Sequence, residues 1–409
     1  MLSASLRLVL ALGTAQTLAW GSTYYLPAIL AVPMAADLGV TTGFVYGAFS
    51  AGLVLAALLG PAAGRRIDLF GGRGMLSLSS LIFATGLALL GASAGPGTLV
   101  AAWLVIGVGM SMGLYEAAFA TLTRLQGRDA RGAITGITLL AGFASTICWP
   151  LSALLDAEFG WRATCFFWAA MHLVIGLPLN RFLVPAHTTP DPAPPTPSPQ
   201  TVDQPADQST DQSAAPPAPT GQRLRLTMVL LATIFAVSWM TASAMAAHLP
   251  RLLIEAGATP TAAIAAAALV GPAQVIGRML EFGIFRHYHP LLSARMAALA
   301  HPLGAAALLV FGAPAAAVFA GLHGIGTGIL TIAQGTLPLA LFGPAGYGRQ
   351  LGLLMIPARF AQATAPFAFA LLLERFGVQS ILLTVSLSLL GLACLLTLAT
   401  RPEAKGAHL

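Results

Sequence analysis

Two side chains of opposite charge lie deep inside long apolar stretches of this chain, where an isolated charge is unfavourable. Arg359 lies within the apolar stretch 350–373, and Glu116 lies within the stretch 98–122. On insertion scales a charged side chain at the centre of a membrane costs about 2.5–3.5 kcal/mol, so it requires a partner or a water-filled cavity. A guanidinium can bind a carboxylate through two hydrogen bonds. We therefore expect Arg359 to hold an anionic solute or to pair with an acid of the protein, for which Glu116 is the natural partner.

Other polar side chains in apolar stretches extend this candidate site. Gln362 lies three residues after Arg359, on the same face of a helix. Five more side chains could form hydrogen bonds with a solute, namely Tyr24, Tyr25, His248, His323 and Gln334. The sequence leaves open whether Glu116 exchanges a proton, forms a static gating pair with Arg359, or faces cytoplasmic water. His172 and His301 are expected to pack within the protein.

No spacing in the sequence is typical of a nucleotide-binding loop, a metal cluster or a Ser-His-Asp triad. The glycine-rich stretch 324–335 lacks the lysine and the preceding strand that a phosphate site needs. The sequence therefore predicts no cofactor, no metal and no catalytic residue.

The elements that carry these residues must be membrane helices. The chain has 409 residues, of which 57% are hydrophobic and only 8% are charged, and its mean hydropathy is +0.81. A soluble domain could not solvate itself with so few charges. The net charge of +6 is not read as nucleic-acid affinity, because the basic residues lie in short gaps between apolar stretches.

The apolar stretches predict twelve transmembrane helices in two halves, since a bilayer core of about 30 Å needs about 20 residues per helix. The N-terminal half is expected over 1–185 and the C-terminal half over 223–409. Between them, 186–222 is rich in Pro, Asp, Gln, Ser and Thr, which predicts a disordered linker. The expected spans are 8–33, 41–63, 74–94, 98–122, 132–156, 162–184, 226–250, 261–283, 290–312, 315–342, 350–373 and 378–400.

The distribution of basic residues predicts the orientation. With the N-terminus in the cytoplasm, sixteen of the twenty Lys and Arg residues fall on the cytoplasmic side and three on the outside. This asymmetry predicts a multi-pass protein of the cytoplasmic membrane, with both termini and the linker in the cytoplasm.

A short motif occurs once in each half. GRRIDLFGGR spans 64–73 and GRMLEFGIFR spans 277–286, and each contains Gly-Arg followed by an acid and a final Arg. Such a repeat indicates two similar halves. An acid at the end of a span can pair with Arg and with the N-terminus of a neighbouring helix, and so favour one packing of the halves. The candidate gating residues are Gly64, Asp68, Gly71 and Arg73, with Arg278, Glu281 and Arg286 as their counterparts.

The motif at 64–73 resembles the loop after the second span of the major facilitator superfamily. Gly160-Trp161-Arg162 and Arg131 match other recurrent positions of that family. The stretch 61–73 and the Gly277-Arg278 pair resemble the monocarboxylate and oxalate/formate-type porters. The resemblance implies an all-α membrane fold with two pseudo-symmetric halves of six helices, in which spans one, four, seven and ten line the transport cavity.

The function that follows is secondary active transport by alternating access. The expected solute is a small organic anion such as a monocarboxylate, moved together with a proton by a monomer. One alternative is efflux of toxic compounds, drugs or metalloids. Two others belong to different classes: a membrane-embedded enzyme, and a receptor that would carry a cytoplasmic module.

Overall fold

Every regular element in the described residues, 4–186 and 221–398 of a computed structural model, is a helix. The linker expected over 186–222 lies, apart from its ends, outside these residues. The N-terminal half contains α1 (Ala4–Ala19), the π-helical turn η1 (Trp20–Tyr24), α2 (Pro27–Leu38), α3 (Thr42–Phe70), α4 (Gly72–Gly91), α5 (Pro96–Gly113), α6 (Tyr115–Gln126), α7 (Ala130–Ala141), α8 (Ala144–Met171) and the turns η3 (His172–Gly176) and η4 (Leu179–Leu183). The C-terminal half contains α9 (Gly221–Glu255), α10 (Pro260–Ala268), α11 (Val270–Gly283), α12 (Pro290–Phe311), α13 (Ala316–Phe342), α14 (Tyr347–Phe376) and α15 (Ile381–Thr397).

These helices account for the twelve expected spans. Eight continuous helical stretches of the described chain are long and apolar enough to cross a membrane. Two of them contain more than one span: 96–183 covers the fourth to sixth, and 347–397 covers the last two. The first span falls outside that group because η1 and a bend at 25–26 divide it. Glycines with positive φ allow the chain to turn between spans, as Gly160 does inside α8, at φ 81°.

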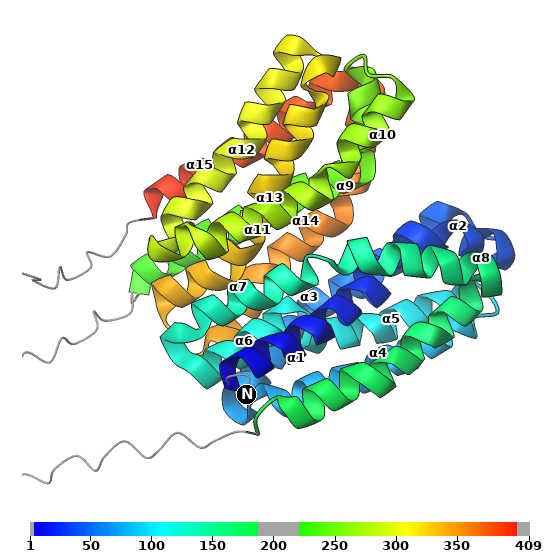
Figure 1. Ribbon diagram of the computed structural model, residues 1–409, viewed down its shortest axis with the longest axis vertical. Coiled ribbons are helices and arrows are strands. Elements are labelled where there is room, and N and C mark those ends of the chain that lie inside the picture. The colour runs from blue at the N-terminus through cyan, green and yellow to red at the C-terminus, as the bar shows by residue number, and fades with distance from the viewer. Residues whose placement is uncertain (1–3, 187–220, 399–409) are drawn as a thin grey trace, which may run out of the picture.

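The two halves are close together at one end and apart at the other (Figure 1). The ribbons of α7, α11, α13 and α14 lie near one another, whereas α10 in one half and α2 with α8 in the other lie far apart. The end where they meet carries the turns at 71, 127–129, 284–289 and 343–346. We call it the arginine-rich end, because seven arginines lie within five residues of these turns: Arg66, Arg73, Arg124, Arg128, Arg131, Arg286 and Arg349.

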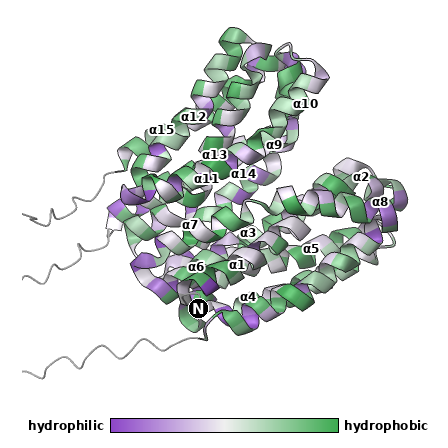
Figure 2. Cartoon of the chain, viewed as in Figure 1, coloured by the Kyte–Doolittle hydropathy of each residue, from purple (hydrophilic) through white to green (hydrophobic). Residues whose placement is uncertain are grey.

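The surface matches a lipid environment. Hydrophobic residues cover the long helices of both halves, and hydrophilic residues gather near the helix ends, for example at the far end of α8 (Figure 2). Many large apolar side chains are exposed, among them Phe182, Val310 and Phe367. On a water-facing surface such exposure would favour aggregation, but in a bilayer it is the expected lipid contact.

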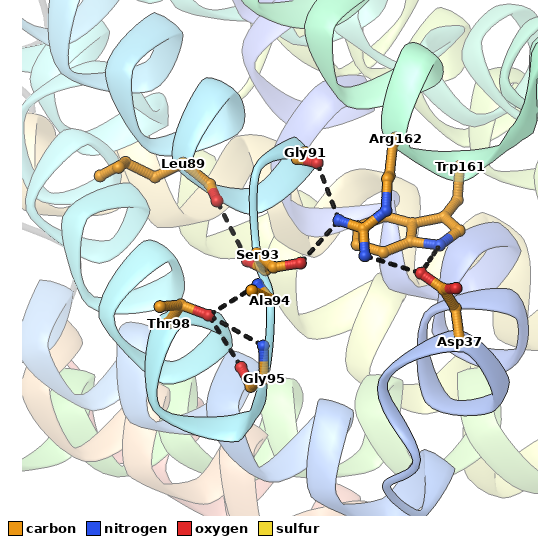
Figure 3. Close-up of polar contacts among 9 residues, drawn as sticks. All are labelled: Asp37, Leu89, Gly91, Ser93, Ala94, Gly95, Thr98, Trp161 and Arg162. Carbon is orange, nitrogen blue, oxygen red and sulfur yellow. Dashed lines mark hydrogen bonds and ion pairs between the residues drawn. The ribbon is translucent and has the colours of Figure 1, made fainter.

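A polar cluster ties three helices together at the end opposite the arginine-rich end (Figure 3). Arg162 donates to the carbonyl oxygens of Gly91 at 3.0 Å and Ser93 at 2.6 Å. Arg162 Nη2 is 2.7 Å from Asp37 Oδ2, which also accepts from the Trp161 indole at 3.2 Å. The guanidinium thus satisfies carbonyls at the end of α4 that have no partner within the helix, and it fixes α2, α4 and α8 relative to one another.

Candidate functional site

A cavity of about 790 Å³ lies between the two halves. From the N-terminal half it is lined by the first span, by Tyr115 at the start of α6, and by α8. From the C-terminal half it is lined by α9, α10, α11 and α13. Its walls include Ile29, Trp149 and Pro250, which lie toward the end opposite the arginine-rich end. The cavity therefore extends toward that end. Tyr24, Tyr25, His323 and Gln334, all candidates from the sequence, are among the lining residues.

Arg278 also lines this cavity, which the sequence repeat does not indicate. It is 4% exposed, and its Nη2 makes a long hydrogen bond of 3.5 Å to Gln274 Oε1. Its Nε and Nη1 have no hydrogen-bond partner. Gly142 of the other half approaches the guanidinium so closely that a Cβ there would overlap Nη1. The gating role expected for Arg278 stays a prediction: the residue lies one turn before Glu281 and contributes a buried cation to the cavity wall.

No Asp or Glu is among the described residues that line the cavity. Aromatic side chains form much of the wall: Trp20, Tyr24, Tyr25, Tyr115, Trp149, Phe235 and Trp239. A cation with unused donors in such surroundings favours binding of an anion or of ordered water. The aromatic faces add apolar contact area.

Arg359 and Glu116 are in contact, with Nη2 and Oε1 2.7 Å apart. The side chains are 5% and 15% exposed, and Gln362 Oε1 accepts from Arg359 Nη1 at 2.9 Å. The guanidinium carbon lies 5.8 Å from the Trp20 ring centre and 5.4 Å from that of Trp239. Since both tryptophans line the cavity and Arg359 does not, this cation lies behind an aromatic pair and has its partner inside the protein.

The aromatic pair contains one ring from each half. The rings of Trp20 and Trp239 are parallel to within 1°, with centroids 6.3 Å apart. Gln334 Oε1 accepts from the Trp239 indole nitrogen at 3.0 Å, which orients that ring. The candidates predicted from the sequence do not include Trp20 or, in the other half, Trp239. Its place in the middle of the seventh span was the available signal.

The remaining histidines have different surroundings. His248 does not line the cavity and bonds to the carbonyl oxygen of Pro366 at 2.8 Å. His172 is buried and bonds to Ser22 Oγ at 2.8 Å, which fits the packing role expected for it. His323 lies 3.0 Å from His301, Nδ1 to Nδ1.

At the arginine-rich end, Asp68 forms a contact between the halves. Its Oδ1 accepts from the backbone N–H of Gly348 at 2.8 Å, and Oδ2 accepts from that of Arg349 at 2.9 Å. Both donors belong to the first turn of α14, whose free N–H groups and partial positive charge favour an anion. The sequence motif predicts both a helix N-terminus and an arginine as partners. In the described residues only the former is present, while Arg124 donates to the backbone oxygen of Asp68 instead.

Glycines allow α3 and α14 to touch along their backbones beside this contact. A Cβ on Gly64 would overlap the carbonyl group of Gly348, and one on Gly352 would lie 2.7 Å from Pro61 Cα. Gly60 and Gly64 on α3 thus face Gly348 and Gly352 on α14, with the four-residue spacing of close membrane-helix contacts.

Glu281 forms a second acidic contact between the halves at this end, with a partner that differs from the expected ones. It lies 3.0 Å from Arg131 on α7, not beside Arg278 or Arg286. Arg131 also donates to the carbonyl oxygens of Tyr288 at 2.6 Å and Phe285 at 3.0 Å. Glu281 is 2% exposed. The partner differs from the expected one because Glu281 of the C-terminal half faces the N-terminal half, where it meets Arg131.

The remaining motif residues, Gly71, Arg73 and Arg286, lie at or near helix ends. Gly71, with φ 83°, ends α3, and Arg73 lies partly buried in the first turn of α4. Arg286 is exposed, bonds to His287 at 3.1 Å, and lies over the Phe282 ring. The expected pairing of Arg286 with Glu281 is not present in the described residues.

Comparison with known proteins agrees with this architecture. The family model of the Major Facilitator Superfamily matches residues 12–319. The chain belongs to this superfamily. The human organic anion transporter TETRAN superposes with a TM-score of 0.68 at 18% identity, covering 96% of this chain and 100% of that one. The E. coli fucose:proton symporter superposes with a TM-score of 0.71 at 14% identity, covering 98% and 100%, and a structure of it in the outward conformation gives the same values.

At these identities the superpositions show the shared fold. No curated protein matches the chain significantly. As a member of the superfamily, the protein is a multi-pass membrane transporter of small molecules, and its family points away from an enzyme.

Proposed function

We propose that this superfamily member moves a small organic anion, such as a monocarboxylate, together with a proton across the cytoplasmic membrane. The observation that carries the proposal is the guanidinium of Arg278, buried in the wall of the central cavity with two nitrogens that lack partners. With no lining carboxylate to neutralise it, a solute carboxylate is the complementary group.

The proposed cycle starts from the conformation described above. With the arginine-rich end in the cytoplasm, as the basic residues favour, the cavity opens outward while the Asp68 and Glu281 contacts close the inner side. Alternating access requires these contacts to break as the halves rock. In this proposal Arg359 stabilises the packing behind the cavity through its pair with Glu116, and Arg278 takes the solute.

The test uses purified monomeric protein in liposomes with an imposed pH gradient. Radiolabelled lactate, oxalate and benzoate are compared with a neutral and a cationic aromatic compound, for wild type, Arg278→Gln and the exposed control Arg225→Gln. Hydrogen bonds to a charged group are worth about 1.5–3 kcal/mol, so Arg278→Gln should raise the KM for the acid by about 10- to 100-fold, whereas Arg225→Gln should resemble wild type.

The aromatic lining supports efflux of flat apolar compounds as a second candidate. Transport of the neutral or cationic compound, with Arg278→Gln fully active, would favour efflux and overturn the anion proposal.

A further inference from the structure

Two buried histidines of the C-terminal half form a hydrogen-bonded pair that the proposed function does not yet use. His301 on α12 and His323 on α13 are 5% and 3% exposed. Their Nδ1 atoms are 3.0 Å apart, and His301 Nε2 lies 2.9 Å from Thr384 Oγ1 on α15. Three helices thus meet in one chain of polar groups.

The hydrogen-bonded series His323, His301 and Thr384 determines which ring nitrogens carry protons when both imidazoles are neutral. Thr384 Oγ1 lies 2.8 Å from the carbonyl oxygen of Ile381, which can only accept, so the hydroxyl proton lies there. His301 Nε2 must therefore carry a proton and donate to Thr384. Its Nδ1 is then an acceptor, and His323 Nδ1 donates to it. This leaves His323 Nε2 with a free lone pair and no hydrogen bond to any described residue.

His323 lies between two cavities. It lines the central cavity of about 790 Å³. It also lines a second cavity of about 30 Å³, together with His301, which is room for about two water molecules. Four hydroxyl side chains line this small cavity, namely Ser238, Thr241, Thr327 and Ser388. Thr241 Oγ1 is buried without a hydrogen-bond partner, which favours ordered water beside the histidines.

The charged and titratable groups around His323 are few. Arg278 of α11 lines the same central cavity, and His301 of α12 is in direct contact. From α9 and α15 the lining groups are the neutral hydroxyls named above. No Asp or Glu lines either cavity within the described chain, and Glu116 is held by Arg359 behind the aromatic pair. Among the described side chains that line the central cavity, His323 is the one whose unperturbed pKa falls near neutral pH.

We propose that Nε2 of His323 is the proton-binding site of the transport cycle, and that His301 and Thr384 are positioning residues that fix its tautomer. The proposal rests on proton-coupled anion transport and adds its coupling group. A proton from cavity water adds to Nε2 and His323 becomes an imidazolium, while Nδ1 continues to donate to His301. The cavity then holds two cations, so proton and anion each favour binding of the other, by the same factor.

The first test needs no solute. Full-length protein with ¹⁵N-labelled histidine is placed in lipid nanodiscs, and the His323 signals are assigned by their loss in His323→Gln. At high pH the expected tautomer is Nδ1–H, and Nε2 should take up a proton between about pH 8 and pH 4. A ring that stays neutral throughout this range, or one that carries its proton on Nε2 at high pH, would overturn the proposal.

The second test separates coupling from transport in liposomes. Exchange of radiolabelled lactate, oxalate or benzoate at equal pH is compared with accumulation driven by a pH gradient. In His323→Gln the ratio of accumulation to exchange should fall at least about tenfold, because a neutral amide binds no proton at these pH values. His172→Gln, which changes a buried histidine outside both cavities, should keep the wild-type ratio.

The outcomes distinguish the two proposals. If His323→Gln keeps the wild-type ratio, the coupling site is elsewhere and anion transport still stands. If wild type exchanges none of the acids, the anion proposal fails, and the nanodisc titration alone decides whether His323 binds a proton.

Discussion

The pair of Arg359 and Glu116 is the strongest candidate for a stabilising charge contact in the interior. Removing one partner of a buried pair leaves the other charge uncompensated, which typically costs about 3–5 kcal/mol. After Glu116→Gln, Arg359 would keep Gln362 and two aromatic faces as its remaining contacts. These contacts offset part of the stability lost when Glu116 is neutralised.

We expect Glu116→Gln and Arg359→Gln each to lower the unfolding temperature of the detergent-solubilised protein by several degrees. The unfolding temperature of the double variant should fall by less than the sum of the two single-variant decreases, because the double variant leaves no unpaired charge. A thermal-shift assay on the three variants measures this. Strictly additive losses would show that the contact adds no stability.

For individual residues, the sequence indicated which charged side chains lie in apolar stretches more reliably than it indicated what those side chains contact. Arg359 and Glu116 stood out because each is a single charge in an apolar stretch, and the structure places them in contact. The position of Arg278 could not be predicted, because the repeat aligns it with Arg65, which is exposed. Two residues at equivalent positions in the motif thus differ in burial, and burial depends on the helix packed opposite.

Among the elements, the crossing of α3 and α14 determines how tightly the arginine-rich end closes. The glycines there leave no side chain that could rotate out of the way, so an added methyl group must push the backbones apart. Overpacking of this kind costs about 1–3 kcal/mol. That is enough to shift a two-state equilibrium by roughly 5- to 150-fold.

Gly64→Ala should therefore open the arginine-rich end. A cysteine introduced at Thr331, in the cavity wall, would be labelled faster by an impermeant maleimide added on that side, in a background without the native cysteines. Gly47→Ala is the matched control on α3, because a Cβ there meets nothing within 4 Å. Equal labelling rates in both variants would contradict the role assigned to the crossing.

The twelve spans were predictable because the apolar stretches are long and the turns between them contain glycine, proline or charge. The breaks inside spans were not. The π-helical turn at 20–24 and the interruptions near 114 and 269 each lie inside a stretch predicted as one continuous span. There the neighbouring helices, rather than local propensity, determine the backbone.

For the molecule as a whole, the two acidic contacts at the arginine-rich end hold one conformation. Asp68 binds the start of α14 and Glu281 binds Arg131, so each half contributes one acid. A charge at a helix N-terminus is worth about 0.3–1 kcal/mol when exposed and up to about 2 when partly buried. Neutralising both acids should therefore shift the population toward the opposite conformation.

Spin labels at Val32 and Ile264, both exposed at the open end, can report this shift. In Asp68→Asn with Glu281→Gln, the distance distribution between the labels should gain a shorter component, larger than in either single variant. If the distribution is unchanged in the double variant, the contacts do not control the opening.

The stacked indoles of Trp20 and Trp239 provide an intrinsic spectroscopic probe of the relative position of the two halves. Two parallel chromophores whose centres are 6.3 Å apart couple electronically, and each is attached to a different moving body. Any rocking of the halves changes their separation or tilt, so the near-ultraviolet circular dichroism and the emission of the unmodified protein should change with every turnover. Trp239→Phe should remove that signal, and conformational exchange could thus be followed in native membranes without an attached dye.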